Sequence, residues 1–197
     1  MPGSAEIYAI VFAAGASRRF GRAKLLESFA GEALVARAAR LARQCCGERS
    51  ALVTGHRAAE VANAAAGHCA IVLENPLHAQ GFGTSIAFAA GELGAKADAL
   101  LLLLADQPLV GPDHVEKLLG AWSGAADEIV ATAFRGTFGP PVLMPKAAFP
   151  ALTRLTGDAG ARSLFTDPRF RVTLVECDAA AFDIDTEADL DDLRRGT

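Results

Sequence analysis

The sequence predicts an α/β fold in which a mostly parallel, Rossmann-like sheet lies between two layers of helices, a three-layer α/β/α arrangement. Of the 197 residues, 51% are hydrophobic and 21% are charged, which suits a full apolar core and argues against disorder. In the first half, short apolar runs typical of strands alternate with longer runs at helical spacing. The run Ala99–Leu104 is apolar throughout, as expected of a strand covered by helices on both faces.

The regular first half is expected to fold as successive strands and helices. Its helices carry alanine, leucine and arginine three or four positions apart, whereas its strands are short and apolar. Pro112 stands where proline suits the first turn of a helix. In chain order we expect strand Ile7–Ala13, helix Glu32–Gln44, strand Ala51–Thr54, helix Arg57–Ala66, strand Ala70–Leu73, helix Thr84–Leu93, strand Ala99–Leu104 and helix Asp113–Trp122.

The alternation weakens after about residue 125, which indicates insertions in the second half. Strands are expected at Glu128–Phe134 and Pro141–Met144, joined by a glycine-containing turn, and at Phe170–Glu176. A short helical stretch is expected at Lys146–Leu155 and a last helix at Thr186–Arg195. No repeat or linker interrupts the chain, so we expect residues 1–197 to form one domain.

Charge and composition exclude several classes of protein. The net charge of −4 lacks the basic excess of most nucleic-acid-binding proteins, so no nucleic-acid partner is expected. No apolar run approaches the roughly 20 residues of a membrane span, and the N-terminus lacks the features of a signal peptide. We therefore expect a cytoplasmic protein without a membrane partner.

Cysteine and histidine show no metal-binding pattern. The sequence has no C-x-x-C pair, so the cysteines are expected to be buried free thiols. The histidines have no ligand spacing and are expected to be ordinary surface or loop residues. These residues are Cys45, Cys46, Cys69, Cys177, His56, His68, His78 and His114.

A basic, glycine-containing loop, Ala13–Lys24, follows the first strand. Ligands of open α/β sheets bind beyond the carboxyl ends of the strands, and small residues let backbone N–H groups approach an anion. The loop matches neither the P-loop pattern nor the dinucleotide fingerprint. Its positive charges, on Arg18, Arg19, Arg22 and Lys24, indicate a polyphosphate ligand, the alternative being a solvated surface turn.

Carboxylates follow the buried strand and recur near the C-terminus. Asp106 lies two positions after the run Ala99–Leu104, where it would face the same crevice as the basic loop. Mg²⁺ usually binds one or two carboxylates together with substrate phosphates, so Asp106 is a candidate ligand, or else a turn or capping residue. If residues 183–185 are extended, the two-residue period of a strand places Asp183 and Asp185 on one face, and either residue is the expected second Mg²⁺ ligand. Thr186 is a candidate cap of the last helix.

Glycine-rich segments contain the remaining candidate ligand-binding residues. In Gly81–Ile86, Thr84 or Ser85 would cap the following helix and leave free N–H groups for a ligand, the alternative being a plain glycine-rich helix start. Gly55 lies near the same edge of the sheet. In the segment Gly157–Arg162, the arginine could bind a phosphate group with two hydrogen bonds, and Asp158 could orient it or cap a helix.

The pattern A-A-G-x-S-x-R-x-G-x-x-K over Ala13–Lys24 resembles the signature loop of the NTP-transferase superfamily, which has a glycosyltransferase-A-like fold. The resemblance implies that this loop wraps a triphosphate and that Arg19 and Lys24 neutralise charge on its phosphates. It also implies that Asp106 holds Mg²⁺ and that Gly81–Ile86 contacts the nucleobase.

Further motifs resemble the molybdopterin nucleotidyltransferase branch, and molybdenum cofactor cytidylyltransferases most closely. They are G-x-G-T-S-I, D-Q-P, G-x-P, G-D-x-G-A-R and D-I-D-T-x-x-D-L, and the resemblance runs from Ile7 to Leu190. Guanylyltransferase relatives typically carry G-G where this chain has Ala14-Gly15, which implies CTP. Phe20, where many relatives have methionine, is a mild departure. The implied reaction transfers CMP from CTP to the molybdenum cofactor, and a molybdenum hydroxylase would receive the product.

Specific residues are expected to take part in catalysis, metal binding, nucleotide binding and acceptor binding. The expected catalytic residues are Arg19, Lys24 and Asp106, and the expected metal ligands are Asp106, Asp183 and Asp185. Nucleotide binding is expected at Ala13, Ala14, Gly15, Ser17, Arg19, Lys24, Gly55, Gly81, Gly83 and Ser85, and acceptor binding at Gly139, Pro141, Asp158 and Arg162. Two alternatives stay open: an NTP transferase acting on a sugar or isoprenoid-precursor phosphate, and a non-catalytic cofactor carrier. A carrier would have no need of a metal-triphosphate site.

Overall fold

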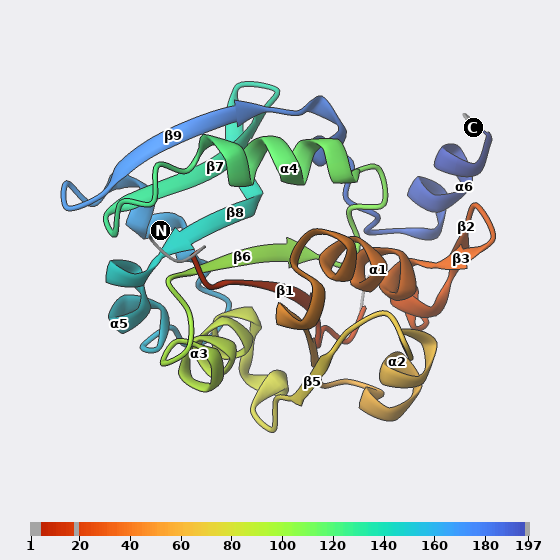
Figure 1. Cartoon of the computed structure of the whole chain (residues 1–197). Helices are drawn as coiled ribbons and strands as arrows, with labels where there is room; N and C mark the ends of the chain where they lie inside the picture. The colour runs from red at the N-terminus through yellow and green to blue at the C-terminus, as the bar shows by residue number, and fades with distance from the viewer. Residues whose placement is uncertain (1–4, 18–19, 196–197) are drawn as a thin grey trace.

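A seven-stranded sheet forms the middle layer of the computed structural model, which describes residues 5–17 and 20–195 (Figure 1). Its strands lie in the order β5-β4-β1-β6-β8-β7-β9. Only β8 runs antiparallel to its neighbours, so the predicted mostly parallel sheet is confirmed. The bounds are β1 Ile7–Ala13, β4 Ser50–Thr54, β5 Ile71–Glu74, β6 Ala99–Leu104, β7 Glu128–Phe134, β8 Thr137–Pro145 and β9 Arg171–Glu176.

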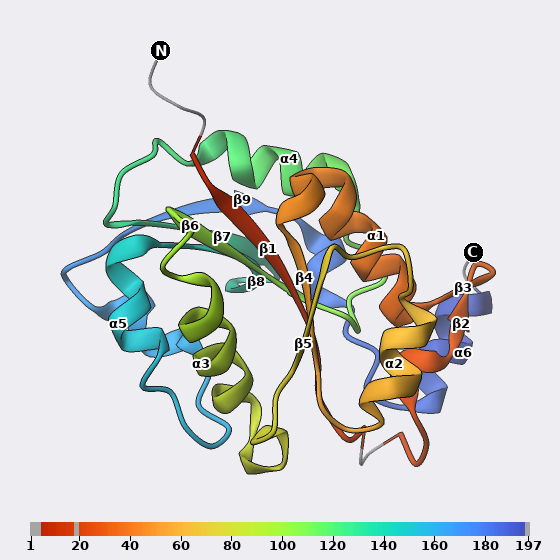
Figure 2. The same ribbon diagram turned by 60° about the horizontal axis from the view of Figure 1, so that its bottom comes forward.

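Helices cover both faces of this sheet, as Figures 1 and 2 show. On one face lie α1 (Leu34–Cys46), α2 (Ala58–Ala64) and α4 (Pro112–Ala121), and on the other lie α3 (Phe82–Leu93) and the short α5 (Phe149–Leu152). Helix α6 (Glu187–Arg195) packs outside these layers, beside a small hairpin of β2 (Ser28–Phe29) and β3 (Glu32–Ala33). The predicted three-layer arrangement is therefore confirmed.

Strand β6 explains the uniformly apolar run Ala99–Leu104. Leu101 and Leu103 belong to the core under α1 and α4, whereas Leu100 and Leu102 belong to the core under α3 and α5. Full burial of one such side chain stabilises a fold by about 1.5–3 kcal/mol, so a polar residue at any of these positions would be costly. Because β6 lies between β1 and β8, Asp106 emerges at the middle of the sheet edge.

The structure corrects the expected start of the first long helix. Glu32 and Ala33 pair with Phe29 and Ser28 in the β2–β3 hairpin, and α1 begins only at Leu34. The two turn residues, Ala30 and Gly31, both have positive φ values, 49° and 82°. Turns with two positive φ values match the twist of a hairpin, which is why the chain reverses here instead of entering the helix.

A strand expected around Asp183 and Asp185 is also absent from the described residues. The backbone N–H of Ile184 donates to the carbonyl oxygen of Asp106 at 3.0 Å, a single long-range bond rather than a ladder. Thr186 does cap α6 as predicted, because its Oγ1 accepts from the N–H of Asp189 at 3.2 Å. The Asp189 carboxylate accepts in return from the N–H of Thr186 at 2.7 Å, so the two residues form a reciprocal cap.

The cysteines are free thiols that are half-buried rather than fully buried. Burial raises the pKa of Cys45 and of Cys69 to about 11, so both thiols are protonated at neutral pH. Across residues 5–17 and 20–195, no helix combines the length and apolar character needed to cross a bilayer.

Candidate active site

A cavity of about 960 Å³ opens at the carboxyl ends of β1 and β6. This is the edge of the sheet where a ligand was expected. The lining comes from the loop after β1, the turn containing Lys24, His56 after β4, the segment that leads into α3, and the carboxylates Asp106, Asp158 and Asp185. The lining side chains and backbone belong to Phe12, Ala14, Gly15, Ala16, Ser17, Lys24, Leu25, His56, His78, Ala79, Gln80, Gly81, Phe82, Ser85, Leu104, Asp106, Asp158 and Asp185.

Lys24 and Asp106 meet in this cavity although they lie far apart in sequence. Lys24 begins a short 3-10 turn, Lys24–Leu26, and only 8% of the residue is exposed. Its Nζ lies 2.8 Å from Asp106 Oδ2 and 3.6 Å from Asp185 Oδ1. The predicted juxtaposition of the basic loop with the acid after β6 is therefore present. Arg19 and Arg18, the other predicted cations of the loop, lie outside the described residues.

The fourth cation of the loop does not line the cavity. Arg22 lies on the surface, with its Nε 2.8 Å from Glu27 Oε1 and 3.3 Å from Glu187 Oε1. Exposed pairs of this kind contribute little to stability. The pair with Glu187 places Arg22 beside the start of α6 and away from the cavity. Among the described cations of this loop, only Lys24 reaches Asp106 and Asp185.

Gln107 holds the carboxylate segments together, a role that the sequence reasoning missed. The side chain is 6% exposed, and its Nε2 donates to the carbonyl oxygens of Ala180 at 2.9 Å and Pro140 at 3.3 Å. One residue after Asp106, it thus fixes the chain just before Asp183. The signal available in the sequence was a polar residue directly after a buried strand, at the ligand edge of the sheet.

The carboxylates create an excess of negative charge. Asp183 is an exposed residue, yet partial desolvation of its carboxyl group, followed by the charge of Asp106, raises its pKa to about 6, while Gln107 and Lys24 partly oppose the shift. A carboxyl group that ionises reluctantly beside other carboxylates marks a place where a further cation would be stabilised. Carboxylate oxygens are the ligands that Mg²⁺ prefers, so the donor set fits this ion.

Within residues 5–17 and 20–195, no group of three or more His, Cys, Asp or Glu side chains is close enough to enclose an ion unaided. Mg²⁺ usually completes its coordination with waters and substrate phosphates around one or two carboxylates. The arrangement therefore suits an ion that arrives with a phosphate ligand better than a permanently enclosed one.

The loop after β1 has room for a ligand. A Cβ added to Gly15 would meet no atom within 4 Å, and Ser17 adopts a left-handed φ of 50°. The Ala14 carbonyl accepts from the N–H of His56 at 3.2 Å, which joins this loop to the end of β4. Ala13, a predicted nucleotide contact, is buried in β1 and does not line the cavity.

The segment before α3 differs from the predicted cap. The helix begins at Phe82 with Gly81 as its first flanking residue, so Thr84 and Ser85 lie inside it. Thr84 Oγ1 donates to the Gly81 carbonyl at 2.8 Å, and the buried Asn75 amide donates to the Thr84 and Ser85 hydroxyls at 3.1 Å each. Neither hydroxyl group caps the helix, because both lie within its first turns and are hydrogen-bonded to Asn75.

Gly81 and Gly83 serve close backbone packing. The N–H of Gly83 donates to the Gly157 carbonyl at 2.8 Å, and a Cβ at Gly83 would lie 2.6 Å from the Ala159 carbonyl oxygen. A Cβ at Gly81 would overlap the Gly157 backbone. The predicted nucleotide and acceptor loops are thus one packed unit, and Asp158 lines the cavity from the same side as Gly81.

The other predicted acceptor residues lie outside the cavity lining. Arg162 is exposed on the 3-10 helix Ala161–Thr166. Gly139 pairs with Thr132 in the β7–β8 ladder, and the Pro141 carbonyl accepts from the Thr132 hydroxyl at 2.7 Å. Gly139 and Pro141 therefore shape strand β8 rather than the wall of the cavity.

The four histidines occupy different environments. His56 and His78 line the cavity, and His78 occupies the space where a Cβ on Gly55 would lie, which explains the glycine. His114 is buried in α4, with its Nε2 2.8 Å from Thr132 Oγ1. The expectation that every histidine is an ordinary surface or loop residue is wrong for His114.

Residues 9–173, from β1 into β9, match the MobA-like NTP transferase domain. Purine catabolism protein PucB of Bacillus subtilis (strain 168) is 33% identical over 102 residues, which are 50% of this chain and 48% of PucB. The chain thus aligns with about half of the length of this relative.

Solved structures share the whole fold. Rv0371c from Mycobacterium tuberculosis H37Rv has a TM-score of 0.81 at 26% identity, covering 98% of this chain and 99% of that one. A structure of Rv0371c in complex with manganese has a TM-score of 0.77 at 24% identity, covering 98% and 100%. Molybdopterin-guanine dinucleotide biosynthesis protein A from Archaeoglobus fulgidus has a TM-score of 0.71 at 18% identity, covering 95% and 97%, a likeness of fold. Because the family match spans most of the chain, the protein belongs to the MobA-like NTP transferase family.

Proposed function

We propose that the protein is a nucleotidyltransferase that transfers CMP from CTP to the phosphate of the molybdenum cofactor and releases pyrophosphate. One observation carries the proposal: the buried Lys24 Nζ lies 2.8 Å from Asp106 Oδ2 at the ligand edge of the sheet. A cation beside a carboxylate at the end of a central strand supplies the two kinds of group that a metal-bound triphosphate needs. Membership of an NTP transferase family supports the same reaction class.

The chain would act mainly by position and charge. The open loop Ala14–Ser17 gives phosphates access to backbone N–H groups, and Lys24 offsets negative charge that develops on the α-phosphate and the pyrophosphate. An oxygen of the acceptor phosphate forms a bond to the α-phosphorus as the bond to the β-phosphate oxygen breaks, so pyrophosphate leaves with that electron pair. No protein nucleophile is required for this in-line displacement.

Mg²⁺ is the proposed metal. Asp106, with Asp183 or Asp185, would hold it, and when bound the ion would neutralise phosphate charge. The gathered carboxylates and the raised pKa of Asp183 support a cation here. The manganese complex of Rv0371c supports a divalent ion in a protein of the same fold.

The finer assignments of base and acceptor rest on sequence motifs. Ala14-Gly15 in place of G-G favours CTP over GTP, and Ser85 and Asp158 provide polar groups in the lining of the cavity. The D-Q-P and D-I-D-T motifs favour a molybdopterin acceptor, and the fold of the Archaeoglobus fulgidus protein supports it. A molybdenum hydroxylase is the proposed recipient of the product.

The decisive measurement is pyrophosphate release with each of the four NTPs, in the presence of Mg²⁺ and one acceptor at a time. The acceptors are the molybdenum cofactor, a sugar phosphate and an isoprenoid-precursor phosphate. Release only with CTP and the molybdenum cofactor would support the proposal. Pyrophosphate release with a sugar phosphate or an isoprenoid-precursor phosphate would show that the protein is a transferase for that acceptor instead. Tight binding of the molybdenum cofactor without pyrophosphate release would show that the protein is a cofactor carrier instead.

A further inference from the structure

The Lys24 ammonium group lies against oxygens that the proposed metal would need. It is 2.8 Å from Asp106 Oδ2 and 3.6 Å from Asp185 Oδ1, and the lysine is 8% exposed. The carboxylates are more accessible, with 25% of the Asp106 side chain and 39% of the Asp185 side chain exposed. A small ion can therefore approach the carboxylates from the cavity, whose wall includes the largely buried Lys24.

We propose that Lys24 keeps a free divalent ion off these carboxylates and admits it together with the nucleotide triphosphate. The inference deepens the proposed function, on which its nucleotide part rests. Mg²⁺ binds carboxylate oxygens at about 2.0–2.1 Å, so its coordination would place a doubly charged ion within a few ångströms of the ammonium. Two cations at that separation repel each other strongly where water is partly excluded.

The triphosphate relieves this competition by giving Lys24 another anionic partner. The lysine has a flexible four-carbon stem, and its backbone is fixed by the turn whose next residue, Leu25, is buried. The ammonium can therefore move from Asp106 to a phosphate oxygen without unfolding the turn. Asp106 stays in place, because its backbone carbonyl is bonded to Ile184 and its neighbour Gln107 is buried.

This exchange makes metal and nucleotide binding mutually dependent. If the triphosphate draws Lys24 away from Asp106, nucleotide raises metal affinity, and by linkage the metal raises nucleotide affinity by the same factor. The substrate that the site selects is therefore the metal–nucleotide complex rather than either component alone. Removing the ammonium would increase the affinity for the metal alone and weaken the dependence on nucleotide.

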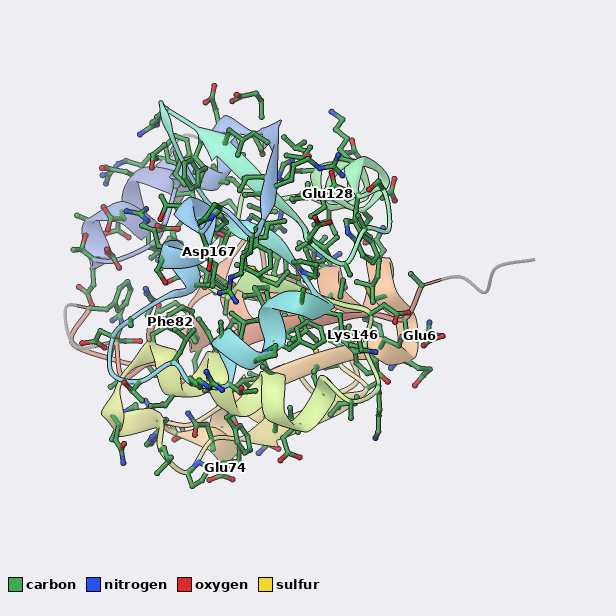
Figure 3. All side chains as sticks on the ribbon, turned by 90° about the vertical axis from the view of Figure 1, so that its left-hand side faces the viewer. Glu6, Glu74, Phe82, Glu128, Lys146 and Asp167 are labelled. Carbon is green, nitrogen blue, oxygen red and sulfur yellow. The ribbon has the colours of Figure 1, made fainter. Side chains whose placement is uncertain are left out.

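The test measures binding of Mn²⁺, as a spectroscopic probe, by the electron paramagnetic resonance signal of the free ion. Wild type, Lys24→Ala and Lys146→Ala are titrated without nucleotide. Lys146 is the matched control, because its substitution changes the net charge equally while its Nζ lies 3.7 Å from Asp98 near the start of β6. Figure 3 shows Lys146 near Glu6, at the opposite end of β1 from Phe82 beside the cavity.

We expect Lys24→Ala to bind Mn²⁺ at least about fivefold tighter than wild type, the lower end of typical coupling between sites. We expect Lys146→Ala to bind it as wild type does. Equal or weaker binding by Lys24→Ala would overturn the inference, as would an equal gain in Lys146→Ala. If Lys24→Ala does not fold, Lys24→Met keeps the length of the side chain without its charge and carries the same expectation.

A second series adds a CTP analogue with a methylene bridge between the α- and β-phosphates. In wild type the analogue should tighten Mn²⁺ binding by several-fold beyond the binding of Mn²⁺ to the analogue alone, and in Lys24→Ala this gain should be smaller. An equal gain in both proteins would overturn the inference even if the proposed transfer occurs. Absence of pyrophosphate release by wild type, with tighter Mn²⁺ binding by Lys24→Ala, would overturn the proposed function and leave the role of Lys24 at the metal supported.

Discussion

The backbone N–H of Gly83 donates to the carbonyl oxygen of Gly157 at 2.8 Å, so the first turn of α3 rests directly on the loop that carries Asp158. Both glycines belong to segments that border the same cavity. The contact couples the positions of the two segments that form this side of the cavity wall.

Gly83→Ala should therefore damage both stability and activity. The added Cβ would lie 2.6 Å from the Ala159 carbonyl oxygen and 2.9 Å from the Thr156 carbonyl oxygen, and backbone atoms must move to relieve it. We expect a loss of about 1–3 kcal/mol in the free energy of unfolding, as for other overpacked sites. Urea denaturation measures the loss, and pyrophosphate release measures the effect on turnover.

Gly91→Ala provides the control within the same helix. A Cβ at Gly91 would meet no atom within 4 Å, so alanine should stabilise α3 by about 0.5–1 kcal/mol through helix propensity. Loss of stability in both variants would refute the explanation by a clash with the backbone of the loop 156–159.

Asp106→Asn should lower turnover by roughly 10²-fold or more, because a neutral amide is a poor partner for both a metal and Lys24. The protein should remain folded, since the carbonyl that bonds to Ile184 is unchanged. Steady-state kinetics with circular dichroism measures both properties. Asp192→Asn, on the exposed side of α6, should retain full activity, and near-normal turnover in Asp106→Asn would remove this residue from the mechanism.

Gln107→Ala should loosen the attachment of the end of β6 to the segments that carry Pro140 and Ala180. The Ala180 and Pro140 carbonyls would lose a buried donor, at a cost of about 1–3 kcal/mol for an unsatisfied polar group. Because Asp183 follows Ala180 closely, we also expect weaker Mn²⁺ binding in the presence of nucleotide. Unchanged unfolding and unchanged Mn²⁺ binding would show that Gln107 does not position the carboxylates.

His114 should make stability depend on pH. Burial, and then the charge of Lys117, lowers the pKa of His114 below its ordinary value of 6.5. The unfolded chain therefore binds more protons than the folded one as the pH falls through about 6.5, and the free energy of unfolding decreases there. Below the folded-state pKa this loss is complete and the dependence on this group levels off.

Urea unfolding from pH 8 to pH 5 measures that dependence. His114→Gln should lose the part of the slope near pH 6.5 while keeping a polar group near Thr132, 2.8 Å from His114 Nε2 in the native protein. The same slope in variant and wild type would place the titrating group elsewhere.

Most of the sheet was predictable because its strands are covered on both faces. The apolar run of β6 and the alternation of strands and helices before residue 125 depend on local pattern alone. The β2–β3 hairpin was missed because each strand has only two residues, too few for a period to be visible. The expected strand at Asp183 was wrong because a tertiary bond from Ile184 to Asp106 determines the backbone there.

The parts of the site that could be predicted from the sequence are its charged residues, because a buried lysine or aspartate at the ligand edge of a sheet has few roles other than binding an ion of opposite charge. Lys24 and Asp106 were identified from charge and from their places after strands, and they lie together. Gly81 and Gly83 pack against a loop more than seventy residues away in sequence, a relation that no local pattern contains. Gln107 was missed because its partners are backbone carbonyls, which any residue could supply.

The small apolar cluster of Phe20, Phe29, Leu34, Ile184 and Leu190 joins the basic loop to the segment that carries Asp185. During synthesis Phe20 leaves the ribosome long before Ile184 and Leu190 exist. This cluster can therefore pack the basic loop against the Asp185 segment only once the chain through α6 has been synthesised.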